Sequence, residues 1–115
     1  MKILIADDSQ FMRKVLKDIL VVGGYTDIVE CIDGKECMAK YTLEKPDLIL
    51  LDIIMPEMDG LAVLKKIGHE AKIVVISAVG QEKMVEEAKK LGVLNYIVKP
   101  FDNNKVLEAV RAALK

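Results

Sequence analysis

The sequence predicts an open, doubly wound α/β fold in which five parallel strands alternate with five helices. Short apolar runs alternate five times with longer amphipathic segments. The runs are hydrophobic throughout, and not only at every second residue. Continuous apolar runs are typical of strands that are buried on both faces, as in a parallel sheet covered by helices. Parallel neighbours need right-handed crossovers through helices, which gives a (βα)5 arrangement.

The apolar runs are short and rich in isoleucine, leucine and valine, which favours strands over buried helices. They are Ile3–Ala6, Ile28–Ile32, Leu48–Leu51, Ile73–Ile76 and Tyr96–Val98. Open sheets of this kind bind ligands beyond the carboxyl ends of their strands. Functional residues are therefore expected just after these runs.

The segments between the runs carry apolar residues at helical spacing, and glycine or asparagine near their ends marks the caps. The first helix is predicted from Met12, Val15, Leu16 and Ile19, and the second from Gly34, Cys37, Met38 and Tyr41. The third is predicted from Leu61, Leu64 and Ile67, ending near Gly68, and the fourth from Met84, Val85, Ala88 and Leu91, capped by Gly92. The fifth is predicted from Val106, Leu107, Val110 and Leu114, with Asn103 or Asn104 as its N-cap.

Length and composition predict one domain spanning residues 1–115. The chain has 115 residues, of which 52% are hydrophobic and 4% aromatic, so we expect a sizeable aliphatic core. Its 17 basic and 18 acidic residues nearly balance, and no basic strip carries stacking aromatics, so a nucleic-acid partner is not expected. No apolar run approaches the roughly 20 residues that span a bilayer, so we expect no membrane association.

The two cysteines, Cys31 and Cys37, are too few for a disulfide scaffold and lack the spacing of a zinc site. We expect both to be buried packing residues in a reducing compartment. The segment from Met1 enters the first strand directly, without the pattern of a signal peptide. These features predict a cytoplasmic location.

Polar side chains follow four of the five predicted strands. They are Asp7 and Asp8 after the first strand, Asp52 after the third, Ser77 after the fourth, and Lys99 with Pro100 after the fifth. Taken singly, each has an ordinary structural explanation; Asp8 or Ser9, for example, would cap the first helix. Together they place three carboxylates, a hydroxyl and an ammonium group on one edge of the sheet, which favours a functional site.

Three clustered carboxylates need a compensating cation. Two like charges about 4 Å apart repel by about 4 kcal/mol at an effective dielectric constant of about 20. A few hard oxygen ligands that leave room for water and phosphate suit Mg²⁺. The metal would orient an incoming phosphoryl group, and Asp52 would accept it as the nucleophile.

These residues resemble the receiver domains of two-component signalling along essentially the whole chain. The motifs are Asp7-Asp8, Asp52 followed by Met55-Pro56 and Asp59-Gly60, Ser77-Ala78, and Lys99-Pro100-Phe101. Within the family, Asp7-Asp8-Ser9 with Met12-Arg13 most resembles the single-domain chemotaxis regulators of the CheY type. The resemblance implies a flavodoxin-like sheet with strand order 2-1-3-4-5.

The resemblance also implies a role for each site residue. Asp8, Asp52 and the backbone carbonyl of Ile54 would bind Mg²⁺ directly, and Asp7 would bind it through water. Lys99 would pair with Asp52 and then with the phosphoryl group, to which Ser77 would donate a hydrogen bond.

Two further features are implied by the resemblance. The Lys99–Pro100 peptide bond is expected to be cis. Tyr96 would be an aromatic switch that turns inward behind Ser77, although an ordinary half-buried strand aromatic would fit the same position. The output face would comprise the fourth helix, the fifth strand and the fifth helix.

Ile54 and Val79 are apolar where some fast-cycling members of this family carry polar side chains that position water. We therefore hypothesise slow self-dephosphorylation and a need for a separate phosphatase. The other expected partners are a histidine kinase of the chemotaxis type and a flagellar or archaellar motor switch protein or adaptor. The domain is expected to be a monomer that catalyses only its own phosphorylation and dephosphorylation. A phosphorelay intermediate of a non-chemotaxis pathway is the alternative.

Three rival functions fit the sequence less well. An aspartyl-phosphate phosphatase would usually carry a second aspartate two residues after the nucleophile, where this chain has Ile54. A flavodoxin-like cofactor binder would need a hydroxyl-rich and glycine-rich first loop in place of Asp7–Gln10. Control of a DNA-binding output domain would need more chain after the fifth helix than the residues up to Lys115 provide.

Overall fold

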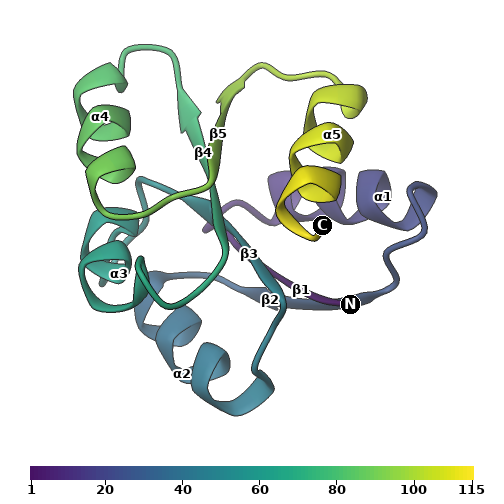
Figure 1. Cartoon of the computed structure of the whole chain (residues 1–115), viewed down its shortest axis with the longest axis horizontal. Coiled ribbons are helices and arrows are strands. Elements are labelled where there is room, and N and C mark those ends of the chain that lie inside the picture. The colour runs from purple at the N-terminus through teal and green to yellow at the C-terminus, as the bar shows by residue number, and fades with distance from the viewer.

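The computed structural model describes residues 1–115 as a five-stranded parallel sheet flanked by five helices, as the sequence predicts (Figure 1). The elements are β1 (Lys2–Ala6), α1 (Gln10–Val22), β2 (Asp27–Cys31), α2 (Gly34–Glu44), β3 (Leu48–Asp52), α3 (Gly60–Ile67), β4 (Ile73–Ala78), α4 (Glu82–Lys90), β5 (Asn95–Lys99) and α5 (Asn103–Ala113). The strand order is β2-β1-β3-β4-β5, which confirms the predicted order.

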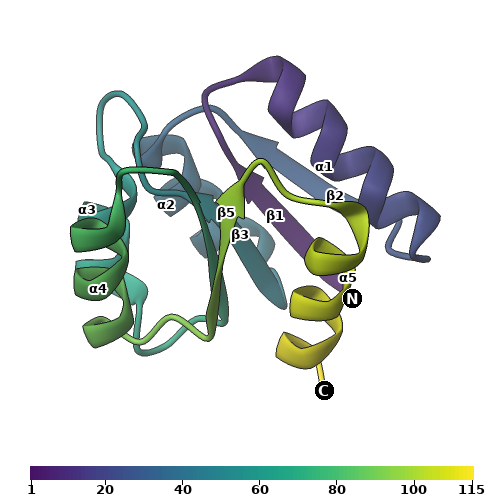
Figure 2. The same cartoon turned by 90° about the horizontal axis from the view of Figure 1, so that it is seen from above.

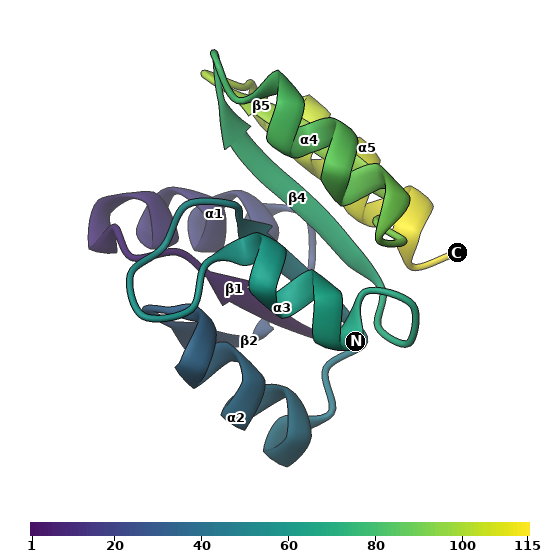
Figure 3. The same cartoon turned by 90° about the vertical axis from the view of Figure 1, so that its left-hand side faces the viewer.

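Two helical layers cover the sheet and explain why its central strands are apolar throughout. Helices α1 and α5 cover one face, and α2, α3 and α4 cover the other (Figure 2). Helix α3 lies between α2 and α4 in the second layer (Figure 3). Ile3 and Ile5 of β1 pack under the first layer, whereas Leu4 and Ala6 pack under the second. Both faces of the strand are therefore buried, and both need apolar side chains.

The strand register sets the position of the functional edge. Ala6, the last residue of β1, lies opposite Leu51 of β3, so Asp7 and Asp52 each come one residue later on neighbouring strands. Ser77 of β4 lies opposite Val98 of β5. The carboxyl ends of β1, β3, β4 and β5 thus form one edge, as predicted.

The predicted N-cap of α5 and the predicted end of β2 are wrong. The N-cap of α5 is Asp102, because its backbone is extended and its Oδ1 accepts the backbone N–H of Lys105 at 2.8 Å. Asn103 and Asn104 are already helical. Strand β2 ends at Cys31, and the N–H of the half-exposed Ile32 instead donates to Glu36 Oε1 at 3.2 Å.

Other local predictions are confirmed. Ser9, not Asp8, is the N-cap of α1, and its hydroxyl accepts the backbone N–H of Met12. Helix α3 ends at Ile67 with Gly68 as its C-cap, as predicted. In α4, however, the C-cap is Leu91, and Gly92, the predicted cap, follows it with a φ of +100°. Both cysteines are fully buried free thiols. None of the five helices combines the length and the hydrophobicity that a membrane span requires.

Candidate functional site

Three carboxylates converge at the carboxyl edge of the sheet. Asp7, Asp8 and Asp52 each place one carboxylate oxygen within 4.8 Å of the others. Asp7 and Asp52 are buried, with 1% and 7% of their surface exposed, and Asp8 is exposed. The cluster is therefore a half-open site whose two inner carboxylates are largely withdrawn from water, where charge repulsion is strong.

One cation faces this cluster. Lys99 Nζ lies 3.6 Å from Asp7 Oδ2 and 3.6 Å from Asp52 Oδ2, and a quarter of its side chain is exposed. Lys99 reaches the carboxylates from the end of β5, two strands away from β3. A single ammonium group cannot balance three carboxylates, so the site retains an excess of negative charge when all three are ionised.

Electrostatics within the site raise the pKa of the Asp52 carboxyl to about 6. Burial is the main cause, and the negative charges of Asp7 and, more weakly, Asp8 add to it. Lys99 and the backbone N–H of Ile54 act in the opposite direction, the latter at 3.3 Å from Asp52 Oδ1. Lys99 and the Ile54 N–H therefore offset only part of the cost of ionising Asp52.

Two buried polar atoms at this edge have no hydrogen-bond partner within the protein. They are Asp7 Oδ2 and Ser77 Oγ. Such atoms are rare in folded proteins, and each costs about 1–3 kcal/mol when nothing satisfies it. Their position beside Asp52 and Lys99 indicates that the site is built to contact a further group.

The donor set fits a hard divalent cation such as Mg²⁺. Carboxylate oxygens are its preferred protein ligands, and it is usually held by few of them together with water. Asp7 Oδ2 accepts no hydrogen bond, and burial together with the charge of Asp7 raises the pKa of Asp52, so a bound cation would stabilise both ionised carboxylates. The residues implied as direct ligands, Asp8 and Asp52, lie within this cluster.

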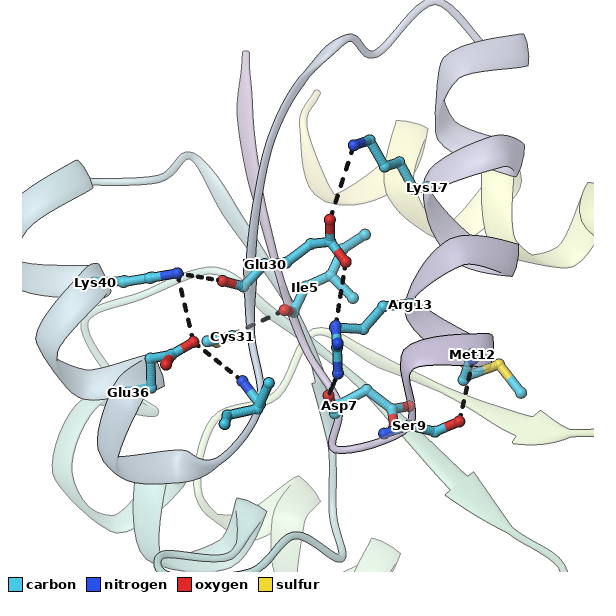
Figure 4. A network of polar contacts seen from close by, with 11 residues as sticks. Ile5, Asp7, Ser9, Met12, Arg13, Lys17, Glu30, Cys31, Glu36 and Lys40 are labelled. Atoms are coloured by element: carbon cyan, nitrogen blue, oxygen red, sulfur yellow. Dashed lines mark hydrogen bonds and ion pairs between the residues drawn. The ribbon is translucent and has the colours of Figure 1, made fainter.

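Asp7 is held in place by a network that sequence reasoning missed (Figure 4). Arg13 Nη1 donates to the backbone carbonyl of Asp7 at 2.7 Å, and Arg13 Nε donates to Glu30 Oε1 at 3.1 Å. On the far side of β2, Lys40 donates to the backbone carbonyl of Glu30. In the sequence, Arg13 had significance only as part of a family motif, because its partner Glu30 is brought close by the β1–β2 register.

Tyr96 lies next to the site in an outward position. The residue is 39% exposed, and Lys89 Nζ lies 4.7 Å from the centroid of its ring. A small cavity of about 150 Å³ lies between Tyr96 and Ser77, with Val85 and Val98 in its lining. Space for the Tyr96 ring therefore exists on the Ser77 side of β5. Directly after β5, the Lys99–Pro100 peptide bond is cis, as predicted.

The rim of the site is partly apolar. Ile54 follows the acidic end of β3 and Val79 follows the hydroxyl-bearing end of β4, and these residues are 47% and 74% exposed. Neither can donate or accept a hydrogen bond through its side chain. The histidine His69 is not part of this rim, because it is an exposed residue in the turn after α3.

Comparison with known proteins gives a consistent result. The response regulator receiver domain model matches residues 3–111. The chain is 45% identical to the chemotaxis protein CheY of Bacillus subtilis, over 98% of this chain and 97% of that protein. It is also 35% identical to sporulation initiation phosphotransferase F of the same organism, over 98% of this chain and 93% of that protein.

Solved structures agree with the sequence comparisons. The CheX–CheY–BeF3–Mg²⁺ complex from Borrelia burgdorferi contains a chain that superposes with a TM-score of 0.92 at 37% identity, covering 100% of this chain and 90% of that one. The receiver domain of NtrX from Brucella abortus superposes with a TM-score of 0.92 at 29% identity, covering 98% of both chains.

Proposed function

Because this chain belongs to the response regulator receiver family, we propose that it is a CheY-like two-component response regulator that accepts a phosphoryl group on Asp52. The observation that carries this proposal is the cluster of Asp7, Asp8 and Asp52 opposite Lys99 at the carboxyl edge of the sheet. The phosphoryl donor would be a histidine kinase of the chemotaxis type. The domain would act in the cytoplasm and catalyse only its own phosphorylation and dephosphorylation.

Mg²⁺ would be held by Asp8, Asp52 and the backbone carbonyl of Ile54, with Asp7 acting through water. When bound, the metal supplies positive charge that offsets the carboxylates and the phosphoryl oxygens. The relative from Borrelia burgdorferi in complex with BeF3 and Mg²⁺ supports this assignment. The three-carboxylate cluster supports it independently.

Phosphoryl transfer would form one bond and break one. A carboxylate oxygen of Asp52 attacks the phosphorus of the kinase phosphohistidine, the P–N bond breaks, and the imidazole keeps the electron pair. Lys99, already 3.6 Å from Asp52 Oδ2, would pair with the transferred group. Ser77 would donate its hydroxyl hydrogen to a phosphoryl oxygen, which would satisfy its unpartnered Oγ.

The signal would pass through Ser77 and Tyr96 to the surface formed by α4, β5 and α5. Shifting a two-state equilibrium from 1:99 to 99:1 takes about 5.5 kcal/mol of differential interaction, a magnitude that several charge-assisted hydrogen bonds can reach. Tyr96 would turn into the cavity beside Ser77 as that hydroxyl moves toward the phosphoryl group. As a monomer, the activated domain would bind a flagellar or archaellar motor switch protein or an adaptor.

A phosphorelay intermediate is the second candidate. The specific observation in its favour is the 35% identity to sporulation initiation phosphotransferase F over nearly the whole chain. In that role Asp52 would pass its phosphoryl group to a histidine of another protein instead of controlling a motor. A histidine phosphotransfer protein that removes the label from phosphorylated Asp52 would support this candidate.

The proposed function is tested by incubating the protein with Mg²⁺ and acetyl phosphate and recording its intact mass. We expect a gain of one phosphoryl group that EDTA abolishes and that Asp52→Asn lacks. Asp18→Asn, which removes an exposed carboxylate of α1, is the control and should be labelled like the wild type. A folded wild-type protein that gains no mass with Mg²⁺ present would overturn the proposal.

Self-dephosphorylation is expected to be slow, because the exposed Ile54 and Val79 side chains offer no hydrogen bond to an attacking water. Phosphorylated protein, freed of donor and kept in Mg²⁺, should persist far longer than seconds, and Ile54→Asn should shorten its lifetime. The decay is followed by intact mass. A lifetime of seconds in the wild-type protein would contradict the expectation and remove the reason for a separate phosphatase.

A further inference from the structure

Arg13 is an ordered, largely buried cation beside the site. Only 12% of its side chain is exposed, and its guanidinium is held at two points. Nη1 donates to the backbone carbonyl of Asp7 at 2.7 Å, and Nε donates to Glu30 Oε1 at 3.1 Å. A planar guanidinium held in this way fixes the position of both acceptors.

Asp7 is fixed at every polar group except one carboxylate oxygen. Its N–H donates to the carbonyl of Cys31 at 3.1 Å, and its own carbonyl accepts from Arg13. Its Oδ1 accepts the N–H of Ser9 at 2.8 Å. The remaining atom, Oδ2, is buried without a hydrogen-bond partner, 3.6 Å from Lys99 Nζ. The surrounding bonds therefore leave a single oxygen of Asp7 without a hydrogen bond, on the side that faces Lys99.

We propose that Arg13 is a positioning residue for the divalent metal, acting through the backbone carbonyl of Asp7. This inference rests on the proposed function, because it concerns the metal bound by that same cluster. Without Arg13, the Asp7 carbonyl loses a charge-assisted hydrogen bond and the turn from Asp7 to Ser9 gains freedom. The Asp7 carboxylate would then lose part of its preorganisation for the metal.

Glu30 links Arg13 to β2, an outermost strand of the sheet. It lies opposite Ile5 in the β1–β2 register and accepts from Arg13, and its Oε2 lies 3.8 Å from Lys17 Nζ (Figure 4). Lys17 is one helical turn after Arg13 and pairs with the same carboxylate, but it forms no hydrogen bond or ion pair with Asp7. Lys17 therefore provides a matched control of equal charge.

The experiment compares Mg²⁺ binding to the wild-type protein, Arg13→Ala and Lys17→Ala by calorimetric titration. Loss of a residue that orients a metal ligand typically weakens metal affinity about 10–100-fold. Because Asp7 would hold the metal through water, we expect a weakening at the lower end of that range, about tenfold, for Arg13→Ala. Lys17→Ala keeps every hydrogen bond of Asp7 and should bind Mg²⁺ within about twofold of the wild type. Equal affinities in the two variants would overturn the inference.

A second readout separates positioning from general damage to the fold. Phosphorylation of Arg13→Ala by acetyl phosphate should need more Mg²⁺ but reach the wild-type extent at saturating metal. A loss that added Mg²⁺ does not restore would overturn the positioning role. Arg13→Lys, which keeps the charge but not the two-point geometry, should bind Mg²⁺ with intermediate affinity and serves if the alanine variant does not fold.

The same titration keeps the two proposals distinguishable. A wild-type protein that binds no Mg²⁺ would overturn the proposed function and this inference together. A wild-type protein that binds Mg²⁺, with unchanged affinity in Arg13→Ala and Arg13→Lys, would overturn the inference alone.

Discussion

Replacing Asp52 with asparagine should stabilise the metal-free protein at pH 7.5 by up to about 3 kcal/mol. The pKa of Asp52 is raised from 3.8 to about 6, mainly by burial and then by the charge of Asp7. At about 1.36 kcal/mol for each pKa unit, this difference corresponds to about 3 kcal/mol of destabilisation by the ionised carboxylate. Asparagine has nearly the same shape and keeps an oxygen for the Ile54 N–H, but carries no charge.

The stabilisation should depend on pH in a defined direction. Below about pH 3.8, Asp52 is protonated in both the folded and the unfolded chain, so asparagine brings no electrostatic gain. Between pH 3.8 and about 6, the folded protein retains a proton that the unfolded chain has lost, so wild-type stability falls as pH rises. Above about pH 6 the carboxylate is ionised in both states, and the advantage of asparagine is complete.

Urea unfolding in EDTA at pH 4 and pH 7.5 measures this difference, because it compares the two proteins at each pH. Asp18→Asn, on the exposed face of α1, is the control and should change the free energy of unfolding by less than about 0.5 kcal/mol. Added Mg²⁺ should stabilise the wild type more than Asp52→Asn, and so reduce the difference between their free energies of unfolding. An asparagine variant less stable than the wild type at pH 7.5 would contradict the expectation.

The fold was predictable because its sequence signals are local. Each central strand reads as a continuous apolar run, since side chains such as Leu4 and Ile5 point into different helical layers but both are buried. The end of β2 was less predictable, because Ile32 is apolar in sequence but lies half-exposed beyond the last paired residue. The N-cap of α5 was mispredicted for a related reason. Asp102 and Asn103 are both residue types that cap helices well, and only the backbone conformation distinguishes them.

The site was predictable in its acidic residues but not in their support. Asp7 and Asp52 directly follow or end apolar runs, and the topology of a parallel sheet brings such positions together. The Arg13–Asp7 bond carries no comparable signal, because it joins a helical side chain to a backbone carbonyl. The pairing of Arg13 with Glu30 depends on how α1 lies over β2, which hydrophobic spacing alone does not determine.

Replacing Gly60 with alanine should destabilise the protein by about 2–3 kcal/mol and impair phosphoryl acceptance. Gly60 is the first residue of α3, where alanine would normally be favoured over glycine. Here a Cβ atom would lie 2.6 Å from the backbone oxygen of Asp52 and 2.6 Å from Ile53 Cα. Both neighbours are main-chain atoms of the buried β3 end, so relief of the clash must displace the proposed phosphoacceptor.

Gly23→Ala is the control, because its added Cβ would clash with a side chain and not with the backbone. A Cβ at Gly23 would lie 2.4 Å from Leu107 Cδ2, the end of a side chain that can move, and Gly23 has a φ of −77° that alanine adopts freely. We expect Gly23→Ala to stay within about 1 kcal/mol of the wild type and to be phosphorylated normally. Urea unfolding and the intact-mass assay test both variants. Equal phosphorylation of Gly60→Ala and Gly23→Ala would mean that the end of β3 adapts without moving Asp52, and that the close approach of α3 does not position the carboxylate.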